Sequence, residues 1–334
     1  MRFAKLTLTT RRFPGLVATG VALLALSACS SSSLPTLTGF AAVRDQAART
    51  ESAASDRATQ LAEVATDCAS CSAALRAVAA ASDERLEALG GLWDPWGGTP
   101  PEGASAPAAV SEAPTDVSAF VAWLARTATR DLEIAADTNR TSAEEARTLS
   151  AAALGRYASA VTIAQAYGID LDAGLDQALL INDRVNAASR QGVQTWSIDL
   201  FDAPGISASF APSGKDLASS QELSSAVATW DCTASTLPQA QVSAGTLTDA
   251  YAVSGELLAR ADTALRAGAA DTRTPRCMLG FLDAPSLASN LLAADSAMLT
   301  SNSSDVRAAG ASAALADIQQ WAPRTPLPAL IGTR

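Results

Sequence analysis

Apolar and polar positions follow a helical period along most of this chain. Between residues 40 and 92, apolar side chains recur at spacings of three and four, for example at Leu75, Val78 and Ala79. This spacing is typical of amphipathic helices, and alanine, leucine, arginine and glutamate, which favour helices, fill much of the stretch. The pair Gly90-Gly91 is a helix stop signal, so the segment is expected to end there.

The same pattern predicts further helices, several of which carry a cap signal. Capping boxes are expected at Thr141 with Glu144 and at Ser219 with Glu222, and Asn302 is the expected cap of the last helix. Together these signals predict about nine helices and no substantial sheet, which indicates an all-α protein folded as an antiparallel helical bundle. The helices after residue 92 are predicted at 116–137, 141–168, 172–191, 217–234, 246–268, 285–300 and 303–321.

Three segments interrupt the helical pattern. Residues 93–115 form a loop rich in Pro, Gly and Ala that opens with Trp93 and Trp96. Turn residues such as Pro204-Gly205 mark a second break, and Pro323, Pro326 and Pro328 favour an extended C-terminal tail. The predicted organisation is an N-terminal bundle at 39–192, a linker at 193–215, a C-terminal helical unit at 216–322 and a tail at 323–334.

The first 28 residues differ from the rest of the chain. Four positive charges and no negative charge precede a short apolar stretch at residues 16–26, which is the architecture of a signal peptide. Leu26-Ser27-Ala28-Cys29 then resembles the lipobox of bacterial lipoproteins. The resemblance implies cleavage before Cys29, lipid attachment to that cysteine and anchoring on the extracytoplasmic face of the cell membrane. Residues 29–38 would be a flexible tether.

The charge of the chain narrows the choice of partners. The full chain carries −10, and the predicted loss of residues 1–28 brings the mature protein to about −14. Nucleic-acid binding requires a basic footprint, so no nucleic-acid partner is expected. The expected partners are the membrane, through the lipid on Cys29, and a protein of the cell envelope.

The cysteine count favours disulfides. Four cysteines remain after Cys29, namely Cys68, Cys71, Cys232 and Cys277, and an even number in an exported protein is typical of disulfide pairing. Three pairings are possible, and we favour Cys232 with Cys277, which would join segments that flank one helical hairpin. Redox activity of Cys68-Ala-Ser-Cys71 and a four-cysteine zinc site are weaker alternatives. The redox alternative is disfavoured because a redox CxxC requires a strand that leads into a helix, whereas residues 62–67 continue a helical pattern.

Missing residue types exclude several kinds of chemistry. The chain contains no histidine, which removes Ser-His-Asp and Cys-His catalysis and histidine-ligated metals. A Ser-Lys dyad would depend on Lys215 in a polar turn. A calcium loop counted from Asp170 would have Leu175 and Ile181 at positions 6 and 12, where an EF-hand requires Gly and Glu. We therefore expect no cofactor, no metal site and no enzyme activity, with carboxylate catalysis as the open exception.

One further resemblance concerns the helical region as a whole. The stretch from Ser82 to Gly91, the helix with Leu132-Glu133 and the capped helix after it are similar to ferritin-like lipoproteins and exported proteins of actinobacteria. That resemblance implies a four-helix bundle. Because a di-iron bundle uses Glu-x-x-His motifs, a chain without histidine would be a degenerate, metal-free version.

These observations lead to three functional hypotheses. The first is a non-enzymatic, lipid-anchored envelope protein with a binding or scaffolding role, contacting its partner through an apolar helix face or the Trp93/Trp96 loop. The second is a solute-binding lipoprotein of a transporter, which requires a two-lobed α/β fold. The third is a degenerate ferritin-like bundle with a pocket for a small apolar ligand.

Overall fold

A computed structural model describes residues 36–104, 106–171, 217–244, 247–277 and 283–333. The described part contains eight α-helices and no strand, which confirms the all-α prediction. The predicted helix at 172–191, the predicted linker at 193–215, Lys215 and Cys29 lie outside the described residues. The elements are α1 (Gly39–Val64), α2 (Ala69–Ala88), α3 (Val117–Ala136), α4 (Ala143–Tyr167), the 3-10 turn η1 (Leu217–Ser219), α7 (Gln221–Ala244), α8 (Leu247–Arg266), α9 (Ala284–Met298) and α10 (Ser304–Trp321).

Helix starts follow the expected cap chemistry, but three predicted caps were wrong by one residue. The α4 capping box is Ser142 with Glu145, in place of Thr141 with Glu144. The Ser220 hydroxyl accepts from the Leu223 amide at the start of α7, and Ser303 caps α10. Adjacent polar residues (Thr141-Ser142, Ser219-Ser220, Asn302-Ser303) leave the position ambiguous in the sequence, and only the backbone geometry selects the residue whose side chain reaches the amide three positions on.

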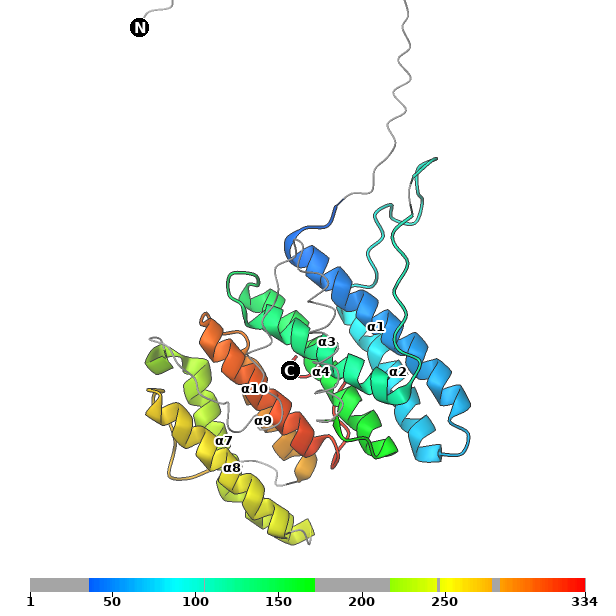
Figure 1. Ribbon diagram of the computed structural model, residues 1–334. Helices are drawn as coiled ribbons and strands as arrows, with labels where there is room; N and C mark the ends of the chain where they lie inside the picture. The colour runs from blue at the N-terminus through cyan, green and yellow to red at the C-terminus, as the bar shows by residue number, and fades with distance from the viewer. Residues whose placement is uncertain (1–35, 105, 172–216, 245–246, 278–282, 334) are drawn as a thin grey trace, which may run out of the picture.

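The helices pair as hairpins and then pack into two bundles. Helix α1 packs on α2, α3 on α4, α7 on α8 and α9 on α10. Helix α2 also packs on α4, and α7 packs on α9. Helices α9 and α10 lie between the N-terminal helices and the α7/α8 hairpin (Figure 1).

Helix α10 contributes to the core of both bundles. Leu315 and Ile318 pack into the core formed with α1–α4, whereas Val306 and Trp321 pack with α7–α9. Arg307 strengthens this junction, since its Nη1 donates to the carbonyl oxygens of Ala135 (3.0 Å) and Thr141 (3.1 Å) at the end of α3. Sharing one helix places the two bundles in direct contact.

The long loop after α2 lies against α1. The Trp93 amide donates to Asp45 at 2.9 Å, and Arg57 Nε donates to the Ala113 carbonyl at 2.9 Å. Trp93 and Trp96 are both partly buried. These bonds hold the two ends of the loop against α1.

Candidate functional site: a groove between α2, α4 and the C-terminal tail

A cavity of about 460 Å³ lies between α2, α4 and tail residues 322–329. Its α2 wall is formed largely by alanines one turn apart, including Ala73, Ala77 and Ala81. Ala158 and Thr162 belong to the α4 wall. Small side chains at these positions leave space between the helices and the tail, and a volume of this size is within the range of small-molecule sites.

The tail is fixed along α4 at both ends. Gln165 Nε2 donates to the Pro323 carbonyl at 3.2 Å, and the Ile331 amide donates to the Ala151 carbonyl at 3.3 Å. The two anchor points on α4 are therefore about 21 Å apart along the helix axis. The predicted extended conformation is found only around residues 326–328, because turns at 322–324 and bends at 329–332 flank that stretch.

Gly155 makes this path possible. A Cβ atom placed on Gly155 would lie 1.8 Å from the carbonyl oxygen of Ala329. Any larger side chain would therefore force the tail away from α4. A glycine inside an otherwise alanine-rich helix normally weakens the helix, and here it allows close approach of the tail backbone.

Two arginines line the groove: Arg324 in the tail is exposed, whereas Arg85 on α2 is fully buried. Arg85 makes two hydrogen bonds to neighbouring side chains. Its Nε donates to Glu51 Oε2 and its Nη2 donates to the Ser82 hydroxyl, both at 2.9 Å. The third nitrogen, Nη1, is buried without a hydrogen-bond partner. The groove hydroxyls of Ser159 and Thr162 donate to carbonyls of their own helix. Arg85 Nη1 is thus a fully buried donor, on a residue that lines the groove, that no protein atom satisfies.

Arg85 belongs to a charge cluster to which each N-terminal helix contributes one residue. Arg156 Nε donates to Glu51 Oε1 at 2.7 Å, and Arg156 Nη1 donates to Asp131 Oδ2 at 2.8 Å. All four side chains are almost completely buried. The partly exposed Arg130 pairs with Asp131 at 2.7 Å, so three guanidinium groups share two carboxylates.

Burial and charge act differently on the two buried arginines. Desolvation lowers the pKa of Arg85 in spite of the attraction of Glu51. For Arg156, desolvation also opposes the charged form, but Glu51 and Asp131 together outweigh it and raise its pKa. Arg85 is therefore the less well compensated of the two cations.

The second bundle also has a buried polar cluster with one residue from each helix. Trp230 Nε1 donates to Asp295 Oδ1 at 2.8 Å, and the Arg260 guanidinium pairs with Asp317 at 2.9 Å. Arg260 also lies over the Trp230 ring at 5.3 Å. Burial and the nearby charge of Asp317 raise the pKa of Asp295, although Arg260 opposes the shift. Both clusters connect helices within their own bundle.

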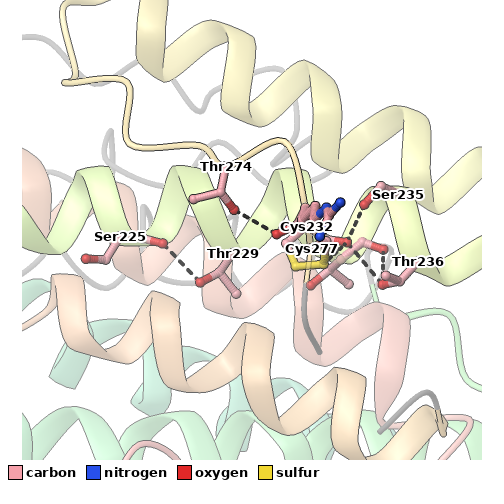
Figure 2. The surroundings of a disulfide bond; sticks show 9 residues. Ser225, Thr229, Cys232, Ser235, Thr236, Thr274 and Cys277 are labelled. Atoms are coloured by element: carbon pink, nitrogen blue, oxygen red, sulfur yellow. Dashed lines mark hydrogen bonds between the residues drawn. A yellow bond between two sulfur atoms is a disulfide. The ribbon is translucent and has the colours of Figure 1, made fainter. Parts of the chain in front are cut away.

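The four paired cysteines form two disulfides. The expected bond between Cys232 and Cys277 is present, and the second bond joins Cys68 to Cys71. Cys232 lies in the middle of α7, and Cys277 lies in the segment after α8, so this bond ties that segment back to α7 (Figure 2). The pairings that would link the two halves of the chain are not used.

Metal-ligand groups and membrane-spanning helices are both absent from the described residues. Within that part of the chain, no group of three or more Cys, Asp or Glu side chains is arranged to hold a metal ion. No described helix is long and apolar enough to cross a membrane. The α/β fold that the transporter hypothesis requires is not found in the described part of the chain.

Comparison of the chain with protein-family models, curated proteins and solved structures finds no match. The ferritin-like resemblance therefore stays a prediction based on the helical pattern, and the groove and the charge clusters have to be interpreted from their own geometry.

Proposed function

We propose that this protein is a binding protein of the cell envelope, anchored to the membrane by a lipid on Cys29, whose groove between α2, α4 and the tail binds a small ligand. The observation that carries the proposal is the buried, unpartnered Nη1 of Arg85 beside an otherwise alanine-rich cavity. A buried donor without a partner costs free energy. A ligand oxygen that accepted this hydrogen bond would remove the cost.

The lining defines the chemistry of the ligand. Alanine and valine side chains favour an apolar body, and Arg85 favours a carboxylate, the acceptor that pairs best with a guanidinium group. Three guanidinium groups share two carboxylates in the adjoining cluster, so an added carboxylate would complete the charge balance. The ligand class is therefore a linear or compact carboxylic acid with an apolar chain.

Calorimetric titration with octanoate tests the ligand class. The chain used is the whole mature sequence, residues 29–334, with Cys29→Ser, because every member of the two cores lies downstream of this position. We expect saturable binding of octanoate and at least about tenfold weaker binding of 1-octanol, which has the same chain but no charge to pair with Arg85.

A matched pair of variants tests the location. Ala77 and Ala80 are both exposed on α2, but only Ala77 lines the groove. Ala77→Trp should fill the cavity and abolish octanoate binding, while Ala80→Trp should bind like the parent chain. Absence of saturable binding, equal binding of octanol, or equal behaviour of the two variants would overturn the proposal.

Membrane anchoring requires its own test. Metabolic labelling with a fatty acid should mark the full-length chain, and Cys29→Ala should remove the label and release the protein from the membrane fraction. Labelling that persists in Cys29→Ala would show that the lipobox assignment is wrong. A stably attached second protein in native mass spectra of the extracted lipoprotein would favour the scaffolding role over the ligand-binding role.

A further inference from the structure

We infer that the Cys68–Cys71 disulfide exchanges with thiol pairs of exported proteins and acts as their oxidant. The sequence argued against redox activity because a redox CxxC is expected to follow a strand, whereas residues 62–67 continue a helical pattern. In the structure a helix and not a strand still precedes the pair, but that helix, α1, ends at Val64, and α2 begins at Ala69. Cys68 is therefore the N-cap of a new 20-residue helix, with Cys71 in its first turn.

The two sulfurs differ in access. Cys68 is partly exposed at the end of the helix, whereas Cys71 is 3% exposed. Cys71 Sγ lies 3.4 Å from the Ala166 carbonyl at the end of α4. An incoming thiolate can therefore reach Cys68, while Cys71 is shielded. Attack at a single sulfur is what an ordered exchange reaction requires.

The surroundings favour a thiolate on Cys68 and a thiol on Cys71. The Cys71 amide donates to Cys68 Sγ at 3.2 Å. Ser70 Oγ lies 3.4 Å from the same sulfur and must be the donor, because a disulfide sulfur carries no hydrogen. Asp67 directly precedes Cys68, but the first turn of α2 contains no acidic residue, and a helix N-terminus stabilises a thiolate. The Ala166 carbonyl, in contrast, is an acceptor for the protonated Cys71 thiol.

The exchange can be written with its electrons balanced. A thiolate of the exported protein attacks Cys68 Sγ, the bond to Cys71 breaks, and Cys71 leaves as a thiolate that takes a proton. The second thiolate of the exported protein then attacks its own sulfur in the mixed disulfide and releases Cys68 as the stabilised thiolate. Two electrons pass from the substrate dithiol to the cysteine pair. Repeated turnover requires a second disulfide, such as oxidised glutathione in vitro.

The other disulfide of the chain supplies an internal control. Cys232 is placed in the middle of α7, and Cys277 Sγ lies 3.2 Å from the Cys232 carbonyl oxygen. The Ser235 and Thr236 hydroxyls donate to that carbonyl and not to a sulfur (Figure 2). No helix N-terminus stabilises a thiolate there. This bond is expected to be a structural one.

The experiment measures both disulfides in one sample. The mature chain with Cys29→Ser is equilibrated in glutathione buffers of graded composition and quenched with acid. Free thiols are then alkylated and assigned by peptide mass spectrometry. We expect the Cys68–Cys71 bond to open in a buffer at least about tenfold less reducing than the buffer that opens Cys232–Cys277. Equal resistance of the two bonds would overturn the inference.

A single-turnover assay tests the activity itself. One equivalent of a reduced peptide with two cysteines should be oxidised by the parent chain and by Cys232→Ser/Cys277→Ser, but not by Cys68→Ser/Cys71→Ser. Circular dichroism should show that the last variant keeps its helix content, and peptide oxidation by it would refute the assignment. Because octanoate binding uses neither cysteine, failure of this assay would be distinguishable from failure of the proposed binding function.

Discussion

Replacing Glu51 with glutamine removes a carboxylate that serves two buried guanidinium groups. Glu51 accepts from Arg85 at 2.9 Å and from Arg156 at 2.7 Å, and all three side chains are fully buried. In Glu51→Gln, Arg85 keeps no acidic partner, and Arg156 keeps only Asp131. Loss of one member of a buried ion pair costs about 3–5 kcal/mol of unfolding free energy, and we expect Glu51→Gln to fall in that range.

The geometry also predicts an order among related variants. Arg85→Met should cost less, about 2 kcal/mol, because Glu51 still accepts from Arg156 and no charge loses its only partner. The double variant Glu51→Gln/Arg85→Met contains no buried Arg85 charge that lacks an acidic partner. The destabilisation of this double variant should therefore be smaller than the sum of the two single effects by about 1–2 kcal/mol.

Urea unfolding followed by far-UV circular dichroism measures these free energies, with a matched surface pair as control. Arg266 and Asp262 are also 2.7 Å apart, but their side chains are 79% and 56% exposed. Asp262→Asn should cost at most about 0.5 kcal/mol. If Glu51→Gln costs no more than Asp262→Asn, or less than Arg85→Met, the argument from burial and shared partners is refuted.

Three further variants test the tail, the helix interior and a buried acid. Gly155→Ala should displace the tail, because the added Cβ would overlap the Ala329 carbonyl. Trypsin should then cut faster after Arg324. Unchanged cleavage would contradict the close approach of the tail backbone to α4. Gly255→Ala, where nothing lies within 4 Å, should instead stabilise α8 by about 0.5–1 kcal/mol in thermal unfolding. Burial raises the pKa of Glu133 to about 7, so folding loses stability as pH rises from about 4.5 to about 7. Glu133→Gln should therefore stabilise the protein at pH 8 by about 1–2 kcal/mol, a value reduced because Glu133 is partly exposed. The same variant should gain little stability at pH 4.5. An equal gain at both pH values would refute the raised pKa of Glu133.

The sequence predicted the helices well because their signals are local. Apolar spacing, cap residues and Gly168, which ends α4 in the left-handed conformation, act within one or two turns of the backbone. The same locality explains the errors. Where two cap residues are adjacent, as at Ser219-Ser220, local pattern permits either, and the fold selects one.

The groove gave only faint signals in the sequence. Alanines at Ala73, Ala77 and Ala81 and a glycine at position 155 are compatible with any tightly packed helix pair. Glu51 and Asp131 could equally belong to an ordinary polar face of a helix. The residues around them in the sequence do not indicate that guanidinium groups from α2 and α4 pair with them in the core.

By itself, then, the sequence determined that the chain is acidic, lacks histidine and is all-α, and it determined the approximate bounds of the helices. It also favoured the pairing of Cys232 with Cys277 over the other possible pairings. Only the tertiary structure decided that α10 belongs to two cores, that four helices bring Glu51, Arg85, Asp131 and Arg156 together, and that the tail lies on Gly155. It also decided that Cys68 begins a helix. The physical reason is one of range: helix formation and capping depend on neighbours three or four residues apart, whereas these contacts join residues separated by 25 to 174 positions and form only when whole helices pack.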